Sequence, residues 1–468
     1  MKNMNINREL VLGYAPVRRD VFPDPRDAIA QRDPIRRRVE QILGKIGNVR
    51  LVDIDWLNEE KLLVENDDVK RVVKHFQSEG VEALFIPHCN FGQEEAVGKL
   101  AKALNVPVLL WGPRDVAPSG FAPRPTDTQC GLFASGKALR RYGVPFTYIE
   151  NCWLDSEALE RGIDQFIRIA NVVRNFRGMR IGQIDVRPRQ FLSVKCNESE
   201  LLEKYGIEVT TINSAEIFGI IDHILQKRPA DIADVVHSGF CSRSNCATQT
   251  KDSLDKMAAL QLAMLEIVQR YDLAGIATEC WELFEKTYGV RICSAAGNLS
   301  EMGIPVTCEA DVHGVVSSVM LSSAARDDGG CSFLADITQR HPTNENAELL
   351  WHCGPFPRKI AKNDTDPALI SWHGQWELKG GIITLCRFDL VETGKYSIFA
   401  DVCHGTDGPV THGTYVWVEV DDWLKWERKF VEGPYIHHIS GIHGDYAPII
   451  KNACRYIPGL QFDCAEFI

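Results

Sequence analysis

The chain has 468 residues, and 52 Lys and Arg stand against 63 Asp and Glu, which gives a formal net charge of −11. At about 100–200 residues per domain, this length predicts two to four domains with ample cores. An acidic chain has no general attraction for nucleic acid or for an anionic membrane, and we expect neither as a partner. No run approaches the roughly 18 apolar residues of a membrane span, and residues 1–12 contain no apolar signal core, so we expect a cytoplasmic protein. The 15 cysteines are odd in number and scattered, which favours reduced thiols over a disulfide framework.

The first part of the chain alternates predicted strands with predicted helices. The strands are expected at Leu10–Pro16, Arg50–Asp55, Val81–Pro87, Pro107–Trp111 and Phe146–Glu150. The helices are expected at Asp27–Ile46, Asp67–Phe76, Glu94–Leu104, Leu132–Arg141 and Ser156–Phe176. Short apolar runs separated by helices of this length are typical of a parallel, doubly wound sheet, because parallel strands need crossover connections.

A second series of the same kind follows. Its strands are expected at Met179–Val186, Glu208–Asn213, Leu273–Ala277, Ile304–Cys308 and Phe333–Ile337, and its helices at Ala215–Gln226, Leu254–Tyr271 and Val312–Ala325. After about residue 345 the pattern becomes β-rich, with strands expected at Gly380–Phe388, Lys395–Val402 and Gly413–Val420, and helical periodicity returns only near Asp445–Arg455. We therefore predict two doubly wound α/β domains, residues 1–177 and 178–345, followed by a β-rich C-terminal domain, residues 346–468.

Phosphate-binding and serine-hydrolase motifs are missing from the sequence. It contains no G-x-x-x-x-G-K-[ST] loop, no G-x-G-x-x-G after the first strand and no G-x-S-x-G elbow. Nucleotide-dependent chemistry and serine hydrolysis therefore lack their usual signs.

Two carboxylates, Glu309 and Asp336, are candidates for a ligand site. Glu309 directly follows the expected strand Ile304–Cys308, at its carboxyl end. Asp311 follows closely and is also suited to cap the next helix. Asp336 lies in an apolar strand, where a carboxylate is costly to bury unless it is paired or binds a metal; the alternative is an Asp beyond the strand end that faces water.

Histidines complete a candidate metal site. His352 lies in an apolar run, where a hydrogen-bonded core histidine is the alternative to a ligand. His437 and His438 are adjacent, and in a strand they would point to opposite faces, so one of them would face a given site. Two carboxylates with one or two imidazoles suit a divalent cation such as Mn²⁺.

This set of residues resembles the L-fucose/L-arabinose isomerase family of ketol isomerases. In the arabinose branch the ligands are a Glu, an acid 27 residues later, a His about 17 further on and the second His of a late pair; here they are Glu309, Asp336, His352 and His438. The phrase around Asp336, F-L-A-D-I, is similar instead to the fucose branch. The order of two α/β domains and a β-rich domain also agrees with the family.

The resemblance implies an intramolecular oxidoreductase that converts an aldose to a ketose through a cis-enediol. It implies that Glu309 and Asp336 serve both as ligands of Mn²⁺, or another divalent cation, and as the acid–base pair. The implied substrate is a free monosaccharide of the fucose or arabinose type, or a substituted hexose. Homo-trimers or homo-hexamers are the implied assemblies.

The candidate substrate contacts are spread over the chain. The fucose branch has a Gly-Ile-Arg-Pro segment; here Gly13–Pro16 lacks the Arg, for which Arg18 or Arg19 could substitute. The segment Pro87–Gly92 resembles a family substrate loop, which makes Asn90 a candidate, although a simple turn after a strand is the alternative. His437 and Trp372 are further candidates; for the tryptophan, core packing is the alternative.

Other functions remain open at this stage. The site also suits another metal-assisted sugar-enolising enzyme, an epimerase or an aldolase, and product analysis would discriminate it. A non-catalytic carbohydrate-binding protein on the same fold needs no acid–base pair, and a scaffold would bind no metal.

Overall fold

The computed structural model describes residues 9–20, 26–117, 119–121, 124, 126–326, 328, 330–363 and 366–466. These residues form two compact units. The N-terminal unit comprises the described residues of 8–174 and of 455–457, and the C-terminal unit comprises those of 175–454 and 458–468. Among them, no helix has the length and apolar character that crossing a membrane would require.

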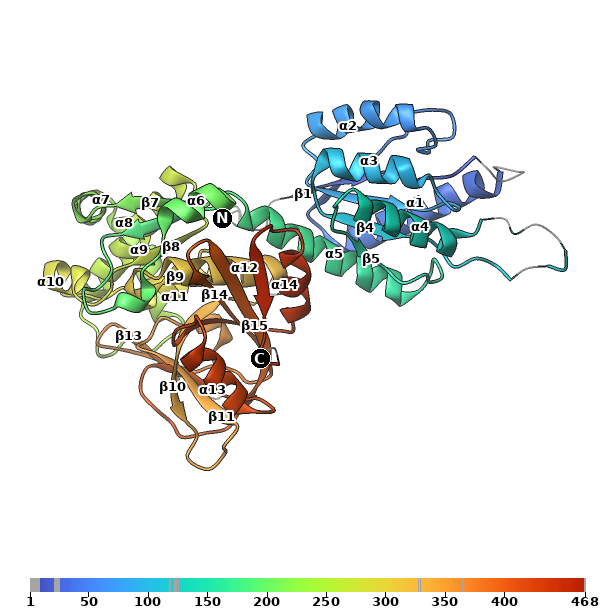
Figure 1. The fold of residues 1–468 in the computed structure, drawn as a ribbon. Coiled ribbons are helices and arrows are strands. Elements are labelled where there is room, and N and C mark those ends of the chain that lie inside the picture. The colour runs from blue at the N-terminus through green and yellow to red at the C-terminus, as the bar shows by residue number, and fades with distance from the viewer. Residues whose placement is uncertain are drawn as a thin grey trace. The chain divides into compact units, whose positions relative to one another are not determined.

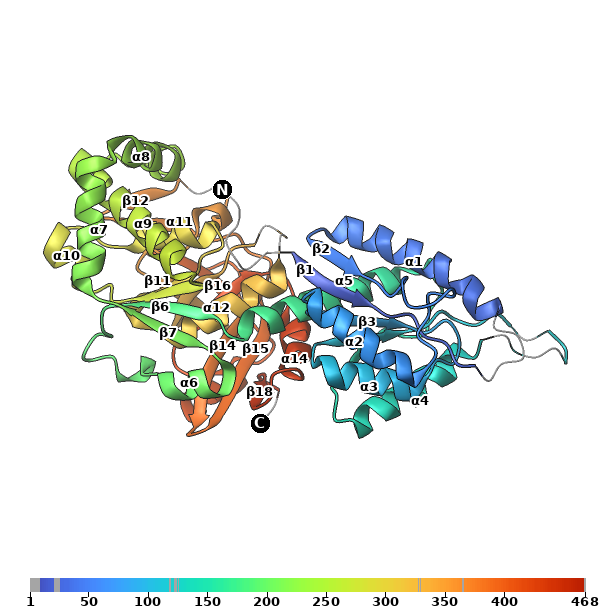
Figure 2. The same cartoon turned by 90° about the horizontal axis from the view of Figure 1, so that it is seen from above.

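The N-terminal unit is built on a five-stranded parallel sheet with the order β2-β1-β3-β4-β5. Its strands are β1 (Leu10–Tyr14), β2 (Val49–Val52), β3 (Ala83–Pro87), β4 (Val108–Trp111) and β5 (Thr147–Tyr148). On one face pack α1 (Arg26–Ile46) and α5 (Glu157–Phe176), and on the other α2 (Val69–Ser78), α3 (Glu94–Leu104) and α4 (Thr128–Arg141) (Figure 2). The strand order reverses between β1 and β3, where sheets of this kind open a crevice at their carboxyl ends.

The C-terminal unit contains a second parallel sheet, with the order β7-β6-β8-β9. Its strands are β6 (Arg180–Ile184), β7 (Glu208–Ile212), β8 (Gly275–Thr278) and β9 (Val306–Thr307). The helices of this part are α6 (Glu198–Tyr205), α7 (Ser214–Lys227), α8 (Pro229–Asp234), α9 (Lys251–Tyr271), α10 (Leu283–Tyr288), α11 (Cys293–Glu301) and α12 (Val312–Ala325). Here the strand order reverses between β6 and β8, so a second crevice is expected where these strands end.

A nine-stranded sheet forms the rest of the C-terminal unit. Its strands are β10 (Phe333–Arg340), β11 (Ala347–His352), β12 (Ala368–Ile370), β13 (His373–Glu377), β14 (Ile382–Glu392), β15 (Lys395–Thr406), β16 (Thr414–Glu419), β17 (His438–His443) and β18 (Leu460–Asp463). Because β15 pairs with β16, the strands β16-β11-β10-β17-β14-β15 close into an antiparallel ring. Two helices, α13 (Trp423–Glu432) and α14 (Ala447–Cys454), accompany these strands (Figure 1).

Helix α12 joins the two sheets of the C-terminal unit. It packs against β6 and β8 on one side and against β14 and β17 on the other, and all of its residues but Ser322 are buried. A helix that is apolar or small on every side is typical of such a central position. Its N-terminus therefore lies where the parallel sheet and the antiparallel ring meet.

The predicted class, parallel α/β sheets followed by a β-rich part, is confirmed, with two differences. The antiparallel sheet begins at Phe333, so Asp336 belongs to it rather than to the second α/β domain expected at 178–345. The expectation that helical periodicity returns only near Asp445 is wrong, because α13 precedes it. That helix is capped by Asp422, whose side chain accepts a hydrogen bond from the backbone N–H of Leu424. The helix was not predicted because the side chains that it buries are aromatic, and aromatic residues are common in strands.

Candidate active site

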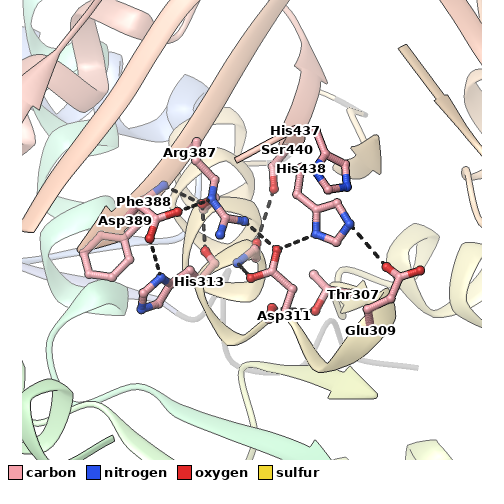
Figure 3. A network of polar contacts seen from close by, with 12 residues as sticks. Thr307, Glu309, Asp311, His313, Arg387, Phe388, Asp389, His437, His438 and Ser440 are labelled. Carbon is pink, nitrogen blue, oxygen red and sulfur yellow. Dashed lines mark hydrogen bonds and ion pairs between the residues drawn. The ribbon is translucent and has the colours of Figure 1, made fainter. Parts of the chain in front are cut away.

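Glu309 lies at the carboxyl end of the parallel sheet in an unusual backbone conformation. Strand β9 ends at Thr307, and both Glu309 and Ala310 have left-handed φ angles, 56° and 55°. For residues with a Cβ this conformation costs roughly 1–2 kcal/mol each, and such strain is concentrated at functional sites. The turn leaves the Glu309 side chain 11% exposed, and it points toward the antiparallel ring (Figure 3).

The antiparallel ring supplies the second carboxylate and the late histidine as neighbours. Asp336 of β10 lies directly opposite His438, the first residue of β17. Asp336 Oδ1 is 3.3 Å from His438 Nε2. The pairing of β10 with β11 shifts register between Ile337 and Gln339, and such bulges often re-aim side chains next to active sites.

The four side chains predicted as metal ligands lie in two overlapping groups, Glu309 with His352 and His438, and Asp336 with His437 and His438, which share His438. Glu309 Oε2 lies 3.3 Å from His438 Nε2 and 3.7 Å from His352 Nε2. Three atoms of the cluster are buried and have no hydrogen-bond partner in the described part of the chain: Glu309 Oε2, Asp336 Oδ1 and His352 Nε2. Unpaired buried polar atoms are costly, and a divalent cation would satisfy all three. The residues present therefore fit a metal ion.

A buried chain of charges holds His438 in place. Asp311 Oδ2 lies 2.9 Å from His438 Nδ1 and also accepts a hydrogen bond from Arg387 Nη1. Arg387 Nε donates to Asp389 Oδ2 at 2.9 Å. Figure 3 shows this row, which His313 extends through Asp389. Asp311 also caps α12, accepting from the Gly314 N–H at 3.0 Å, so the capping alternative and a role at the site are both realised.

These contacts set the charge of the site. Burial raises the pKa of Glu309, but the imidazoles of His352 and His438 outweigh it and hold that pKa well below its ordinary value. Burial lowers the pKa of His438, whereas Asp311 and Glu309 raise it, with a net value of about 9. Asp311 has a pKa well below its ordinary value because the opposing charge of Arg387 outweighs burial. The carboxylates of Glu309 and Asp311 are thus ionised at neutral pH. A metal ligand such as Glu309, and an acid that orients a ligand, such as Asp311, both need this charge.

An aromatic wall borders the ligand cluster. The indole N–H of Trp281 donates to Glu309 Oε1 at 2.8 Å, which fixes one oxygen and leaves the other toward the histidines. The Phe191 ring stacks on the rings of Trp281 and His437, with distances between ring centroids of 6.2 Å and 5.3 Å. His437 Nε2 lies 3.9 Å from Asp336 Oδ1, and the side chain is 47% exposed. His437 therefore lies beside the cluster with a face open to a ligand.

Next to this wall lies a cavity of about 690 Å³, between the loops that follow β6 and β8. Its lining includes Trp281, Glu279 and three cationic side chains, Arg187, Arg189 and Lys286. Glu279 accepts hydrogen bonds from the backbone N–H groups of Trp281 and Leu283, both at 2.8 Å, and so fixes the loop that carries the tryptophan. The cavity occupies the crevice that the reversed strand order predicts.

Comparisons with known proteins agree with this architecture. Residues 13–177 match the model of the fucose/sulfoquinovose isomerase N-terminal domain. A sulfoquinovose isomerase from Alkalicoccus urumqiensis is 22% identical over 457 residues, which cover 95% of this chain and 97% of that protein. The chain is similar over most of its length to members of the fucose isomerase-like family. It is therefore an aldose–ketose isomerase, an intramolecular oxidoreductase.

Two further relatives and one solved structure complete the comparison. A sulfoquinovose isomerase from Priestia megaterium is 22% identical over 403 residues, 82% of this chain and 86% of that protein. One from Clostridium sp. is 23% identical over 285 residues, 61% of this chain and 62% of that protein. A periplasmic solute-binding protein from Actinobacillus succinogenes with bound D-allose covers 58% of this chain and 77% of its own at 9% identity, with a TM-score of 0.17.

The N-terminal candidates lie at the crevice of their own unit. Arg18 follows β1, and its guanidinium is held by Glu60 at 2.6 and 2.8 Å and by Asp20 at 2.9 Å. Asn90 follows β3 and accepts from the backbone N–H groups of Arg19 and Gly92. Both side chains are buried and brace the two loops at the switch point, and their contact with substrate stays a prediction.

Trp372 lies in the turn between β12 and β13, with φ at 72°, and packs against the hydrophobic core. The aromatic residues that border the ligand cluster are instead Trp281 and Phe191, which the sequence reasoning missed. Trp281 follows an apolar strand as Glu309 does, and that shared position was an available signal. Arg387 and Asp389 were missed too, although two charges inside the apolar run of β14 are a sign of a buried pair.

Proposed function

We propose that this isomerase works with a divalent cation held by Glu309, Asp336, His352 and His438. The observation that carries the proposal is that Glu309 with His352, and likewise Asp336, group with the shared His438, and that three of their buried ligand atoms have no hydrogen-bond partner in the described residues. Mn²⁺ suits this mixed oxygen and nitrogen set. When bound, the cation would polarise the carbonyl oxygen of the sugar and stabilise the negative charge that develops there.

The residues of the chain perform the proton transfers. One carboxylate of the pair Glu309 and Asp336 removes the proton from C2 of the aldose, which gives a cis-enediol. The other carboxylate accepts the proton of the C2 hydroxyl or returns a proton to C1, which gives the ketose. A positioned acid–base group contributes roughly 10²–10⁴-fold to the rate. Asp311 keeps His438 oriented through Nδ1, so that Nε2 stays directed at the cluster.

The substrate is a monosaccharide that carries an anionic group at the end remote from C1 and C2. The support is the cavity beside Trp281, whose lining contains Arg187, Arg189 and Lys286 together with Asp185, Glu279 and Glu282. Lys286 pairs with Glu282 and Glu279 accepts from backbone N–H groups, so Arg187 and Arg189 are the candidates for binding the anionic group. Guanidinium groups suit the bidentate binding of oxyanions such as sulfonate, phosphate or carboxylate. The aromatic wall of Phe191 and His437 provides a face on which the sugar ring can pack.

The test uses a panel of neutral and anionic aldoses with Glu309→Gln and Asp336→Asn. Glu203→Gln, a change of an exposed carboxylate on α6 outside the cavity, is the matched control. We expect both site variants to lose activity by about 10²-fold or more while the control keeps it. A fully active Glu309→Gln enzyme with metal still bound would reject the assignment, and a product other than the ketose of equal carbon number would reject the reaction.

The remote end of the substrate has its own test. Arg189→Gln should lower kcat/KM for anionic aldoses and leave kcat/KM for neutral aldoses nearly unchanged. An equal loss on both classes of sugar would contradict the anionic-group proposal without touching the isomerase assignment.

Assembly into a homo-trimer or homo-hexamer is part of the proposal. Its support is the similarity to the fucose isomerase-like family, from which this assembly is inferred. Light scattering of the purified chain measures the mass directly, and a monomer with full activity would contradict it.

A further inference from the structure

A second cluster of side chains that could bind a metal lies next to the candidate active site, in contact with His352. It consists of Cys293 at the start of α11, Cys353 just after β11, and His373 at the start of β13. One ligand atom from each residue lies within 4.8 Å of the other two. None of these three residues belongs to the carboxylate and histidine cluster that the isomerase reaction uses.

The spacing of the two sulfurs matches a shared cation. Cys293 Sγ and Cys353 Sγ are 3.6 Å apart. With Zn–S bonds of about 2.3 Å and tetrahedral angles, two thiolates on one zinc ion lie about 3.8 Å apart, whereas disulfide sulfurs are about 2.05 Å apart. The geometry is therefore that of two thiol ligands on either side of one thiophilic ion.

The histidine supplies an independent sign. His373 Nδ1 is buried and lacks a hydrogen-bond partner within the described ranges of the chain. An imidazole nitrogen left unpaired next to two thiols is costly unless something binds it. A thiophilic cation would satisfy this nitrogen and both sulfurs at once.

The backbone around the cluster is built for close approach. Gly354 has a φ of 143°, and a Cβ there would lie 2.4 Å from the backbone nitrogen of Gly374. The Ser294 hydroxyl donates to the carbonyl oxygen of Trp372 at 3.0 Å, which ties α11 to the turn before β13. Three segments far apart in the sequence are thus fixed against one another at the position of the three ligands.

We propose that Cys293, Cys353 and His373 form a second metal site for a thiophilic cation of the Zn²⁺ class. Two thiolates and one imidazole are a ligand set of open zinc sites, in which water takes the fourth position. The site is linked to the first one, because Cys353 Sγ lies 3.3 Å from Nδ1 of His352. A cation here would hold Cys353 and thereby the ring of His352, whose Nε2 faces Glu309.

The experiment is a Co²⁺ titration of the full chain, purified with reductant and chelator under argon and then freed of both. Thiolate ligands give Co²⁺ an intense near-ultraviolet charge-transfer absorption, which carboxylate and imidazole ligands do not. We expect this absorption to saturate at one Co²⁺ per chain. Cys293→Ser and His373→Gln should weaken it strongly, while Cys130→Ser, a change of an exposed cysteine outside the cluster, should leave it intact.

The two sites are separated by a further variant. Glu309→Gln should keep the charge-transfer absorption although the first site is impaired, so a failure of the isomerase proposal and a failure of this one are distinguishable. An absent absorption in the wild-type chain, or one that persists in both Cys293→Ser and Cys353→Ser, would overturn the proposal. Because a serine variant can unfold, circular dichroism accompanies each titration, and the ¹¹³Cd chemical shift of the wild-type chain reports sulfur ligation without any substitution; a shift typical of oxygen and nitrogen ligands alone would also overturn it.

Discussion

Replacing Asp311 by Asn tests the support of the metal site without touching a ligand. The side chains of Asp311 and Arg387 are both fully buried, and Asp311 joins Arg387 to His438. An Asn keeps the shape but has one oxygen where Asp has two. Whichever way its amide is turned, its NH₂ group faces either the Gly314 N–H or the side chains of Arg387 and His438, so at least one present contact is lost.

The size of the effect follows from two terms. Removing an outer partner of a metal-binding histidine costs about 10–100-fold in metal affinity, which is about 1.4–2.7 kcal/mol. Breaking a buried ion pair costs about 3–5 kcal/mol of folding stability, and the lower end applies here because Asp389 still pairs with Arg387. We therefore expect Asp311→Asn to bind Mn²⁺ 10–100-fold more weakly and to lose about 3 kcal/mol of unfolding free energy.

The assay is calorimetric Mn²⁺ titration combined with urea unfolding of the metal-free protein. Asp389→Asn is the matched control, because it removes the other partner of Arg387 and leaves the Asp311–His438 contact in place. It should lose stability and keep nearly the wild-type metal affinity. A folded Asp311→Asn protein that binds Mn²⁺ as tightly as the wild type would show that Asp311 does not support the metal site through His438.

Three further predictions concern single residues. Trp281→Phe removes the hydrogen bond to Glu309 and should lower kcat/KM about tenfold; unchanged kinetics would mean that the indole does not position the carboxylate. Gly314→Ala places a Cβ 2.7 Å from Asp311 Oδ2, and it should cost about 1–3 kcal/mol in urea unfolding and weaken Mn²⁺ binding; wild-type values would contradict this. Burial raises the pKa of Glu348 from 4.5 to about 7. Protonated Glu348 therefore contributes to the folding stability fully below about pH 4.5, and this contribution is lost as the pH rises through about 7. Glu348→Gln should therefore gain up to about 3 kcal/mol over the wild type at pH 8 relative to pH 4.5, and a gap independent of pH would contradict the burial argument.

Much of the fold was predictable because its elements carry local signals. Apolar runs such as Val81–Pro87 and the periodic helices between them indicated the parallel sheets. The helix α13 was missed because its aromatic side chains resemble those of the neighbouring strands, and only its capping Asp422 marks its start. The start of the antiparallel sheet could not be predicted from the sequence pattern either, because the pairing of Asp336 with His438 joins segments about 100 residues apart.

The candidate site divides in the same way. Its four proposed ligands were suggested by spacing and resemblance, because each follows or lies within a recognisable strand or lies in a recognisable motif. The residues that orient them were not, because their roles depend on packing between distant elements. Asp311 reaches Arg387 only because α12 lies against β14, and Trp281 reaches Glu309 only because β8 and β9 are neighbours.

The central claim is that two acids, distant in the sequence, share one divalent cation. Anomalous diffraction from crystals soaked in Mn²⁺ measures this directly. The account predicts a strong peak within bonding distance of Glu309 Oε2, Asp336 Oδ1 and His438 Nε2. A peak that touches only one of the two carboxylates, or that lies away from both, would contradict it.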